Sequence, residues 1–145
     1  MKRRGLNCVF ALLVAFAAAT PRADDNPNDI LIIANNKVAV NSVSIDELRD
    51  IFLKKKANWS DGAKVVPINA PKGSEIRAEF QKKILEITND KEEKYWQERM
   101  IVSGVQPPPS LQSMQKAVFK INGAIGYIYR KDYRKGVVKI LLVLP

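Results

Sequence analysis

Apolar residues along the chain form continuous runs of the length of buried strands. Three such runs cover Ile30–Ala34, Ala124–Tyr129 and residues 137–143. A further strand is expected over residues 64–69, because a Ser-Asp-Gly turn sequence at 60–62 comes just before it. Helical patterns separate these strands. This alternation predicts an α/β fold with a mainly parallel sheet flanked by helices.

A capping box marks the start of the first expected helix. Ser44 stands three residues before Glu47, the spacing at which each side chain can bind the backbone N–H group of the other residue. The apolar positions that recur at helical spacing behind this box are Ile45, Leu48, Ile51 and Phe52. We expect these four side chains to bury one face of the helix, and Trp59 to cover the core nearby.

A second helix is expected to begin at Ser74, directly after the strand at 64–69. Its apolar, inward positions are Ile76, Phe80, Ile84 and Leu85. The charged side chains expected to point mostly outward are Glu75, Arg77, Lys82 and Lys83. The pattern therefore puts Ser74 where a strand ends and a helix begins, which is where ligands gather in α/β sheets.

Two more helices are predicted in the second half of the chain. One has its N-cap at Asn89 or Asp90, and its apolar stripe consists of Tyr95, Trp96 and Met100. The other is capped by Ser110, after a run of three prolines at 107–109 that stiffens the connection. Its apolar positions are Leu111, Met114, Val118 and Phe119.

The segment VVPINAPKGSEIRAEF, residues 65–80, contains the best candidate for a ligand site. Ser74 can accept from the free N–H groups of the first helical turn, and Gly73 lets the main chain approach a ligand closely. The helix start carries a partial positive charge, to which Lys72 and Arg77 add cationic side chains. Together these groups suit a small oxyanion such as phosphate or sulfate. The alternative is that Ser74 is only a helix cap and that Lys72 and Arg77 are solvated surface charges.

Residues 1–23 are predicted to be a signal peptide. The chain begins with basic residues at 2–4, followed by an uncharged apolar run at 5–19. Small residues allow cleavage after Ala19 or after Ala23. No later segment approaches the ~20 apolar residues of a membrane span, so we expect a periplasmic protein without membrane insertion after cleavage.

The rest of the chain is expected to form a short polar tether at 24–29 and a single domain over 30–145. Four basic and no acidic residues precede Asp24, so the 24 basic and 15 acidic residues of the full chain leave a net charge of +5 after cleavage at Ala23. This charge attracts anions in general. Because the basic residues are interspersed with acidic ones, no nucleic-acid partner is expected.

The composition argues against most enzyme classes. The only cysteine, Cys8, lies in the predicted signal peptide, and the chain has no histidine. The usual zinc ligands and the commonest general base are therefore missing, and no metal or other cofactor is expected. A nucleophile–base pair of Ser74 and Lys72 is conceivable, but the lysine would need burial to act as a base. We therefore predict that the protein is not an enzyme.

Three ordered segments carry a resemblance to a known family. They read SIDELRDIFLKKKANWSDGAKVVPI, then APKGSEIRAEF, then NGAIGYI. From about Ile30 to the carboxyl end the chain resembles the periplasmic phosphate-binding proteins of ABC transporters, in the type II periplasmic-binding-protein superfamily. The resemblance implies a single, shortened binding-protein lobe. It also implies hydroxyl and backbone contacts from Ser74 to phosphate, main-chain contacts from Gly73 and Glu75, and Arg77 as a cationic neighbour.

The chain departs from the family pattern at the ligand turn and in size. Ala70 or Lys72 stands near the position of the family's arginine, and Glu75-Ile76 replaces a glycine-threonine pair. The full binders close two lobes on their ligand, and roughly half of such a chain has no counterpart here. A single lobe cannot remove an anion from water, so the expected site is weak and open unless another chain supplies the second wall.

Two functions follow from these observations. The first is an exported solute-binding-protein-like domain that binds phosphate or a similar small oxyanion weakly and is linked to ABC-type uptake or sensing. The alternative is a non-transport adaptor or interaction protein of the cell envelope that reuses a binding-protein lobe. An envelope protein or a second copy of the chain would then be its partner.

Overall fold

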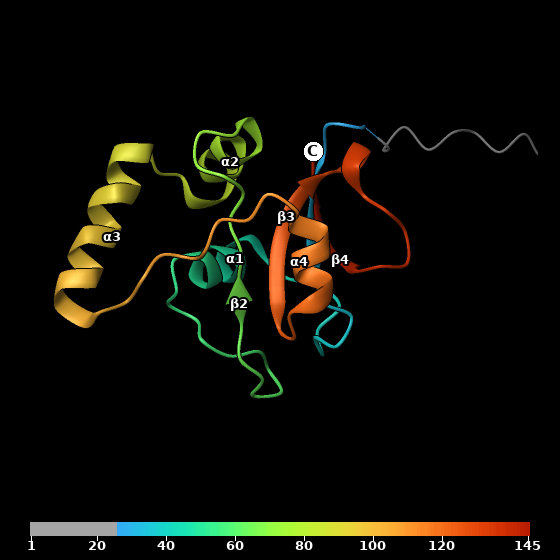
Figure 1. Ribbon diagram of the computed structural model, residues 1–145, viewed down its shortest axis with the longest axis horizontal. Helices are drawn as coiled ribbons and strands as arrows, with labels where there is room; N and C mark the ends of the chain where they lie inside the picture. The colour runs from blue at the N-terminus through green and yellow to red at the C-terminus, as the bar shows by residue number, and fades with distance from the viewer. Residues whose placement is uncertain (1–25) are drawn as a thin grey trace, which may run out of the picture.

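The computed structural model of the protein describes residues 26–145 (Figure 1). The predicted signal peptide lies outside these described residues. The strands are β1 (Ile30–Ala34), β2 (Val66–Pro67), β3 (Ala124–Tyr129) and β4 (Lys139–Leu144). They form one four-stranded sheet in the order β2-β3-β1-β4. The helices are α1 (Ile45–Phe52), α2 (Glu75–Phe80), α3 (Asn89–Ser103) and α4 (Met114–Lys120), with a π-helical turn η1 (Gln81–Leu85) and a 3₁₀ turn η2 (Arg130–Asp132).

The predicted α/β class is confirmed, but the expectation of a mainly parallel sheet is wrong. Only β2 and β3 pair in parallel, whereas β1 pairs antiparallel with both β3 and β4. Strands β2, β3 and β4 therefore share one direction, and the reversed strand β1 lies between β3 and β4. A continuous apolar run indicates that both faces of a strand are buried. Such burial does not depend on the direction in which the strand runs. All five residues of β1 are buried, as the run predicted.

Helices cover both faces of the sheet. Gly126 of β3 faces α4, because a Cβ atom on this glycine would lie 2.3 Å from Met114 Sδ and 3.2 Å from Val118 Cγ2. Side chains alternate between the faces of a strand, so the next residue, Tyr127, points to the opposite face. There its ring stacks on Phe80 at a centroid distance of 3.9 Å. The main core thus lies between β3 and the α1–α2 layer.

Helix α1 begins as predicted, with two differences at its exposed side. Ser44 Oγ accepts from Glu47 N at 3.1 Å, which confirms the cap. The Glu47 carboxylate instead binds Lys56 Nζ, so the box is not reciprocal. Ile45, expected in the core, is exposed because the buried stripe starts one turn later at Leu48.

The predicted caps of α3 and α4 are wrong. Thr88, rather than Asn89 or Asp90, is the N-cap of α3, and its hydroxyl accepts from Lys91 N. Helix α4 begins four residues after Ser110, at Met114. The segment around Ser110 is held extended beside residue 69 instead, as an isolated parallel bridge that follows the three prolines. The prolines favour an extended backbone up to Ser110, so this residue pairs with residue 69 and the helix starts only after the bridge.

The buried positions in the middle of the chain agree with the pattern. Trp59 is buried as predicted, and its Nε1 donates to the Gly123 carbonyl oxygen at 3.0 Å. At Gly123 two backbones pass closely, because an added Cβ atom would lie 2.1 Å from the Lys64 carbonyl oxygen. The strand expected at 64–69 is shorter than predicted, with only Val66–Pro67 paired as a ladder. Val66 N and Ile68 N donate to the Gly123 and Ile125 carbonyl oxygens, so the missing N–H group of Pro67 belongs to the edge of the strand that faces away from β3.

Part of the expected tether is bonded to the rest of the fold. The Pro27 carbonyl oxygen accepts from Lys131 N at 3.0 Å, and the Asp29 carbonyl oxygen accepts from Arg130 N at 2.8 Å. The buried Asp29 carboxylate also pairs with the Arg130 guanidinium at 3.2 Å. From Pro27 onward the backbone is therefore anchored to η2 rather than running free.

Candidate functional site

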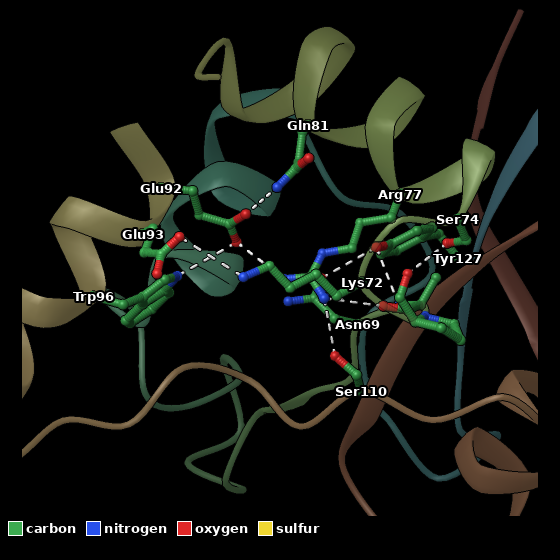
Figure 2. A network of polar contacts seen from close by, with 12 residues as sticks. Asn69, Lys72, Ser74, Arg77, Gln81, Glu92, Glu93, Trp96, Ser110 and Tyr127 are labelled. Carbon is green, nitrogen blue, oxygen red and sulfur yellow. Dashed lines mark hydrogen bonds and ion pairs between the residues drawn. The ribbon is translucent and has the colours of Figure 1, made fainter. Parts of the chain in front are cut away.

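The predicted site residues lie on the loop between β2 and α2, where the chain leaves the sheet. Lys72, Gly73, Ser74 and Arg77 line one cavity with a volume of about 480 Å³. The cavity is bounded by this loop, by α3 and by the proline-containing segment before Ser110 (Figure 2). Glu75 is exposed, as expected for an outward carboxylate, and does not line this cavity. The structure therefore brings the predicted residues together, with the exception of Glu75.

Ser74 is the N-cap residue of α2, but its hydroxyl does not cap the helix. The hydroxyl donates to the Pro71 carbonyl oxygen at 2.7 Å, and Ser74 N donates to the same oxygen at 3.1 Å. The turn places this carbonyl closer to the hydroxyl than the helix amides are, so Ser74 stabilises the loop. Gly73, with φ of +84°, supplies the left-handed residue of the turn and has open space around it.

The first-turn amides of α2 are left without protein acceptors. Within residues 26–145, no hydrogen bond engages the backbone N–H groups of Glu75, Ile76 or Arg77. Such groups are the orphan donors of a helix start and must bind water, a side chain or a ligand. These donors are the strongest feature of the loop that favours an anion.

Arg77 lies inward, which corrects the expectation that it points mostly outward. Only 12% of its side chain is exposed, and its guanidinium lies 3.4 Å from a Glu92 carboxylate oxygen. It also donates to the Ala70 carbonyl oxygen at 3.2 Å and to Ser110 Oγ at 2.9 Å. Arg77 therefore joins the β2–α2 loop, the segment at Ser110 and helix α3 (Figure 2).

Glu92 lines the candidate site and was missed by the sequence interpretation. Its side chain is only 8% exposed, and it accepts from Gln81 Nε2 as well as from Trp96 Nε1 at 3.4 Å. One signal could have located it: Glu92 precedes Trp96 by four residues, which puts both on one face of a helix. The carboxylate compensates the charge of Arg77, which is then not a free cation for a ligand.

Lys72 is the more accessible cation of the cavity. Its side chain is largely exposed, and its Nζ lies 3.8 Å from a carboxylate oxygen of the exposed Glu93. A solvent-exposed pair of this kind contributes little energy and can rearrange easily. The charged side chains that line the cavity are thus two cations and two carboxylates, Lys72, Arg77, Glu92 and Glu93, and they carry no net charge.

A second cavity of about 620 Å³ lies on the other side of the same loop, where Ala70, Pro71 and Ile76 contribute to its wall. The loop is held between the two cavities by Tyr127, whose hydroxyl accepts from Ala70 N at 3.1 Å and donates to Asn69 Oδ1 at 3.1 Å. Burial raises the pKa of Tyr127 to about 12, so the hydroxyl stays protonated at neutral pH. Residues Ala70 and Ile76 therefore face a separate space from Ser74.

Two further features are absent from the part of the chain that the structure describes. Among residues 26–145 there is no group of three or more histidine, cysteine, aspartate or glutamate side chains that could hold a metal ion. In the same part of the chain, no helix has both the length and the apolar character needed to cross a membrane. The arrangement of orphan amides and one accessible lysine is suited to holding a small anion, whereas the Ser74 hydroxyl already donates its proton to the Pro71 carbonyl oxygen.

Comparison with solved structures connects this fold to phosphate-binding proteins. An ABC-type phosphate transport receptor from Vibrio cholerae is similar over 77% of this chain and 44% of its own length, with a TM-score of 0.62 and 20% identity. A phosphate ABC transporter substrate-binding protein with bound phosphate from Clostridium perfringens matches with a TM-score of 0.58 and 22% identity, over 77% of this chain and 43% of its own length. PstS from Borrelia burgdorferi matches with a TM-score of 0.59 and 18% identity, over 77% of this chain and 46% of its own length.

These likenesses concern the fold. No protein-family model matches the sequence, and no curated protein is similar to it. The chain spans less than half the length of each solved structure named above. These structures belong to binding proteins rather than enzymes. The predicted resemblance is confirmed at the level of structure: residues 26–145 contain an α/β fold shared with part of phosphate-type substrate-binding proteins.

Proposed function

We propose that the protein is an exported, binding-protein-like domain that holds phosphate or a similar small oxyanion weakly at the start of α2. It would serve an ABC-type uptake or sensing system. The observation that carries this proposal is the set of three backbone N–H groups, at Glu75, Ile76 and Arg77, that have no acceptor within residues 26–145. Ser74 and Lys72 line the adjoining cavity. Lys72 supplies a movable positive charge, and the Ser74 hydroxyl would donate to the anion in place of its bond to the Pro71 carbonyl oxygen. The fold shared with phosphate-binding proteins supports this ligand class.

The affinity should be low for two physical reasons. Glu92 and Glu93 cancel the charges of Arg77 and Lys72, so long-range attraction of an anion is weak. The cavity is open to solvent on this single lobe, and water and salt then screen the charge-assisted bonds. We expect dissociation constants in the millimolar range, about −4 kcal/mol of binding free energy.

A pair of substitutions at Glu75 tests the role of the backbone donors. Glu75 is the first residue of α2, where proline is well tolerated, and Ser74 already has the extended φ of −73° and ψ of 146° that precedes a proline. Glu75→Pro removes one orphan N–H group together with the carboxylate. Glu75→Ala removes only the carboxylate and is the matched control.

Phosphate and sulfate are titrated into each variant at constant ionic strength, with backbone amide NMR shifts as the readout. The proposal expects Glu75→Ala to bind phosphate at least as well as the wild-type protein. Glu75→Pro should bind several-fold more weakly than Glu75→Ala, since one charge-assisted hydrogen bond is lost. Equal affinities of the two variants, or no saturable shifts near Ser74, would refute the proposal.

Export is the part of the proposal that rests on the sequence alone. The predicted signal peptide at 1–23, the periplasmic location and the single domain at 30–145 are tested together by expressing the full chain in a bacterium. Mass spectrometry of the periplasmic fraction should find a protein that begins at Thr20 or at Asp24. A full-length amino terminus in the cytoplasmic fraction would contradict export.

The adaptor function remains a second candidate because of one surface feature. Ile101 and Val102 at the end of α3 are 81% and 82% exposed, and Met100 beside them is also exposed. Helix α3 stands at one side of the sheet in Figure 1, away from the β1–β4 pair. Three consecutive exposed apolar residues at a helix end are a candidate protein contact. An adaptor would retain its protein partner in a pull-down from envelope extracts when phosphate is absent and when Ser74 is changed to Ala.

A further inference from the structure

The second cavity, on the far side of the β2–α2 loop, is lined by a different set of residues from the first. Its volume of about 620 Å³ falls in the range of pockets that take organic ligands and far exceeds the size of an inorganic anion. Its apolar wall is formed by Ile76, Leu111, Met114, Phe119, Tyr129 and Val137. This space therefore offers apolar contact area to an organic ligand.

Two large apolar side chains of this wall are incompletely covered by the protein itself. Phe119 is 54% exposed and Leu111 is 38% exposed, although both line the cavity. Exposed apolar surface in a concave site is stabilised when a ligand removes it from water. The two side chains come from α4 and from the segment before it, so they border the same opening.

The charged groups at the rim favour an anionic ligand. Lys116 and Arg134 line the cavity, and neither forms an ion pair with any of residues 26–145. Asp132 is the only carboxylate among the lining residues. A further cation, Lys131 Nζ, lies 4.8 Å from the centroid of the Tyr129 ring. The Glu79 carboxylate, which hydrogen-bonds to Tyr129, and the nearby Glu75 carboxylate offset Lys131 at that end of the wall. The lining residues themselves hold two cations and one carboxylate, and both cations, Lys116 and Arg134, lie on the α4 side of the cavity.

The position of Arg134 is fixed through its backbone and not through its guanidinium. Arg134 N donates to Gln115 Oε1 at 3.0 Å, and Gln115 Nε2 donates to the Arg134 carbonyl oxygen at 2.6 Å. This pair of bonds ties the segment after η2 to α4 across the opening. The guanidinium group remains available to bind a carboxylate through two parallel hydrogen bonds.

We propose that this cavity binds a small amphipathic organic anion, an aromatic carboxylate whose ring lies against Phe119 and Leu111 and whose carboxylate meets Arg134 and Lys116. The Asp132 carboxylate disfavours a second negative charge, so the ligand carries one. This site is separate from the oxyanion site at the start of α2, and either can exist without the other.

Three probes with one carbon skeleton test the proposal: 3-phenylpropionate, 3-phenylpropanol and 3-phenylpropylamine. Each is titrated into the mature protein at constant ionic strength, with backbone amide NMR shifts as the readout. The carboxylate should bind saturably and about tenfold more tightly than the alcohol, because of its charge-assisted hydrogen bonds. The shifts should centre on Phe119 and Tyr129. Binding of the amine or the alcohol at equal affinity would overturn the proposal, as would shifts centred on Trp96 in the first cavity.

Variants separate the two halves of the proposed site. Arg134→Gln should weaken the carboxylate about tenfold and leave the alcohol unchanged. Phe119→Ser removes an exposed ring and should weaken both probes. Lys91→Gln on α3 is the charge-matched control and should change neither. Equal carboxylate affinities for Arg134→Gln and Lys91→Gln would overturn the proposal. Inorganic phosphate, titrated separately, should not change the backbone amide NMR shift of Phe119. A missing response to phosphate therefore tests the oxyanion site alone and leaves the test of this cavity unaffected.

Discussion

The buried ion pair between Arg77 and Glu92 gives the sharpest test of how this site is held together. We consider Glu92→Gln, which keeps the shape of the side chain and removes its charge. The two carboxylate oxygens accept from Arg77, Gln81 and Trp96 in the native protein. A glutamine amide has a single acceptor oxygen, so at least one buried donor loses its partner.

The magnitude follows from the burial of the two side chains. Breaking a buried ion pair by removing one partner costs about 3–5 kcal/mol. Here 12% of the Arg77 side chain and 8% of the Glu92 side chain are exposed, and Arg77 keeps its bonds to the Ala70 carbonyl and Ser110 Oγ. The lower end of the range, about 3 kcal/mol, is therefore expected. For a domain of this size this lowers Tm by about 12 °C.

The assay is urea unfolding followed by circular dichroism and by tryptophan fluorescence. The matched control is Glu93→Gln, since Glu93 forms only the exposed pair with Lys72 and should lose less than about 0.5 kcal/mol. Phosphate affinity should move in the opposite direction to stability. Once its carboxylate partner is neutral, Arg77 attracts an anion, and binding should strengthen about threefold. Equal unfolding free energies for Glu92→Gln and Glu93→Gln would show that the pair does not hold α3 to the loop.

Three further substitutions probe the fold around the site. Gly126→Ala should cost about 1–3 kcal/mol in urea unfolding, because its Cβ atom would overlap Met114 Sδ. Gly73→Ala should cost about 1 kcal/mol through backbone strain alone, since φ is +84° and no atom lies within 4 Å of the added Cβ; a larger loss would indicate a packing role. Tyr127→Phe should cost about 1–2 kcal/mol at neutral pH through two lost hydrogen bonds to the loop. Between pH 10 and about 12 the native state keeps the Tyr127 proton that the unfolded chain loses, so stability falls as pH rises, and this fall should be shallower in Tyr127→Phe.

The positions of two strands were predictable from the sequence because apolar runs mark buried segments. The apolar runs at Ile30–Ala34 and Ala124–Tyr129 have the same bounds in the structure as in the sequence. Strand direction was not predictable, because β1 is buried on both faces whether its neighbours run parallel or antiparallel to it. The reversed direction of β1 depends on pairing with β3 and β4, both of which follow it by about 90 residues or more.

The helix caps show where local chemistry competes with long-range contacts. Ser44 caps α1 as its spacing predicts, and its hydroxyl accepts from Glu47 N within the same helix turn. Ser110 has the same local signal, yet its oxygen accepts from Arg77 and its backbone lies beside Asn69. The partner that redirects Ser110 lies 33 residues away in sequence, beyond the range of a capping pattern.

The candidate site was predictable in position but not in electrostatics, and the two differ for a physical reason. A helix start and a glycine turn are local features, and the structure has both where the sequence predicted them, at Ser74 and Gly73. The charge around that loop is set by α3, which places Glu92 and Glu93 opposite the two basic residues. Because those side-chain charges cancel, any preference of this loop for an anion has to come from the backbone amides that the Pro71–Ser74 turn leaves unbonded. The turn that orients the main chain, more than the number of basic residues near it, therefore decides whether this loop can bind an oxyanion.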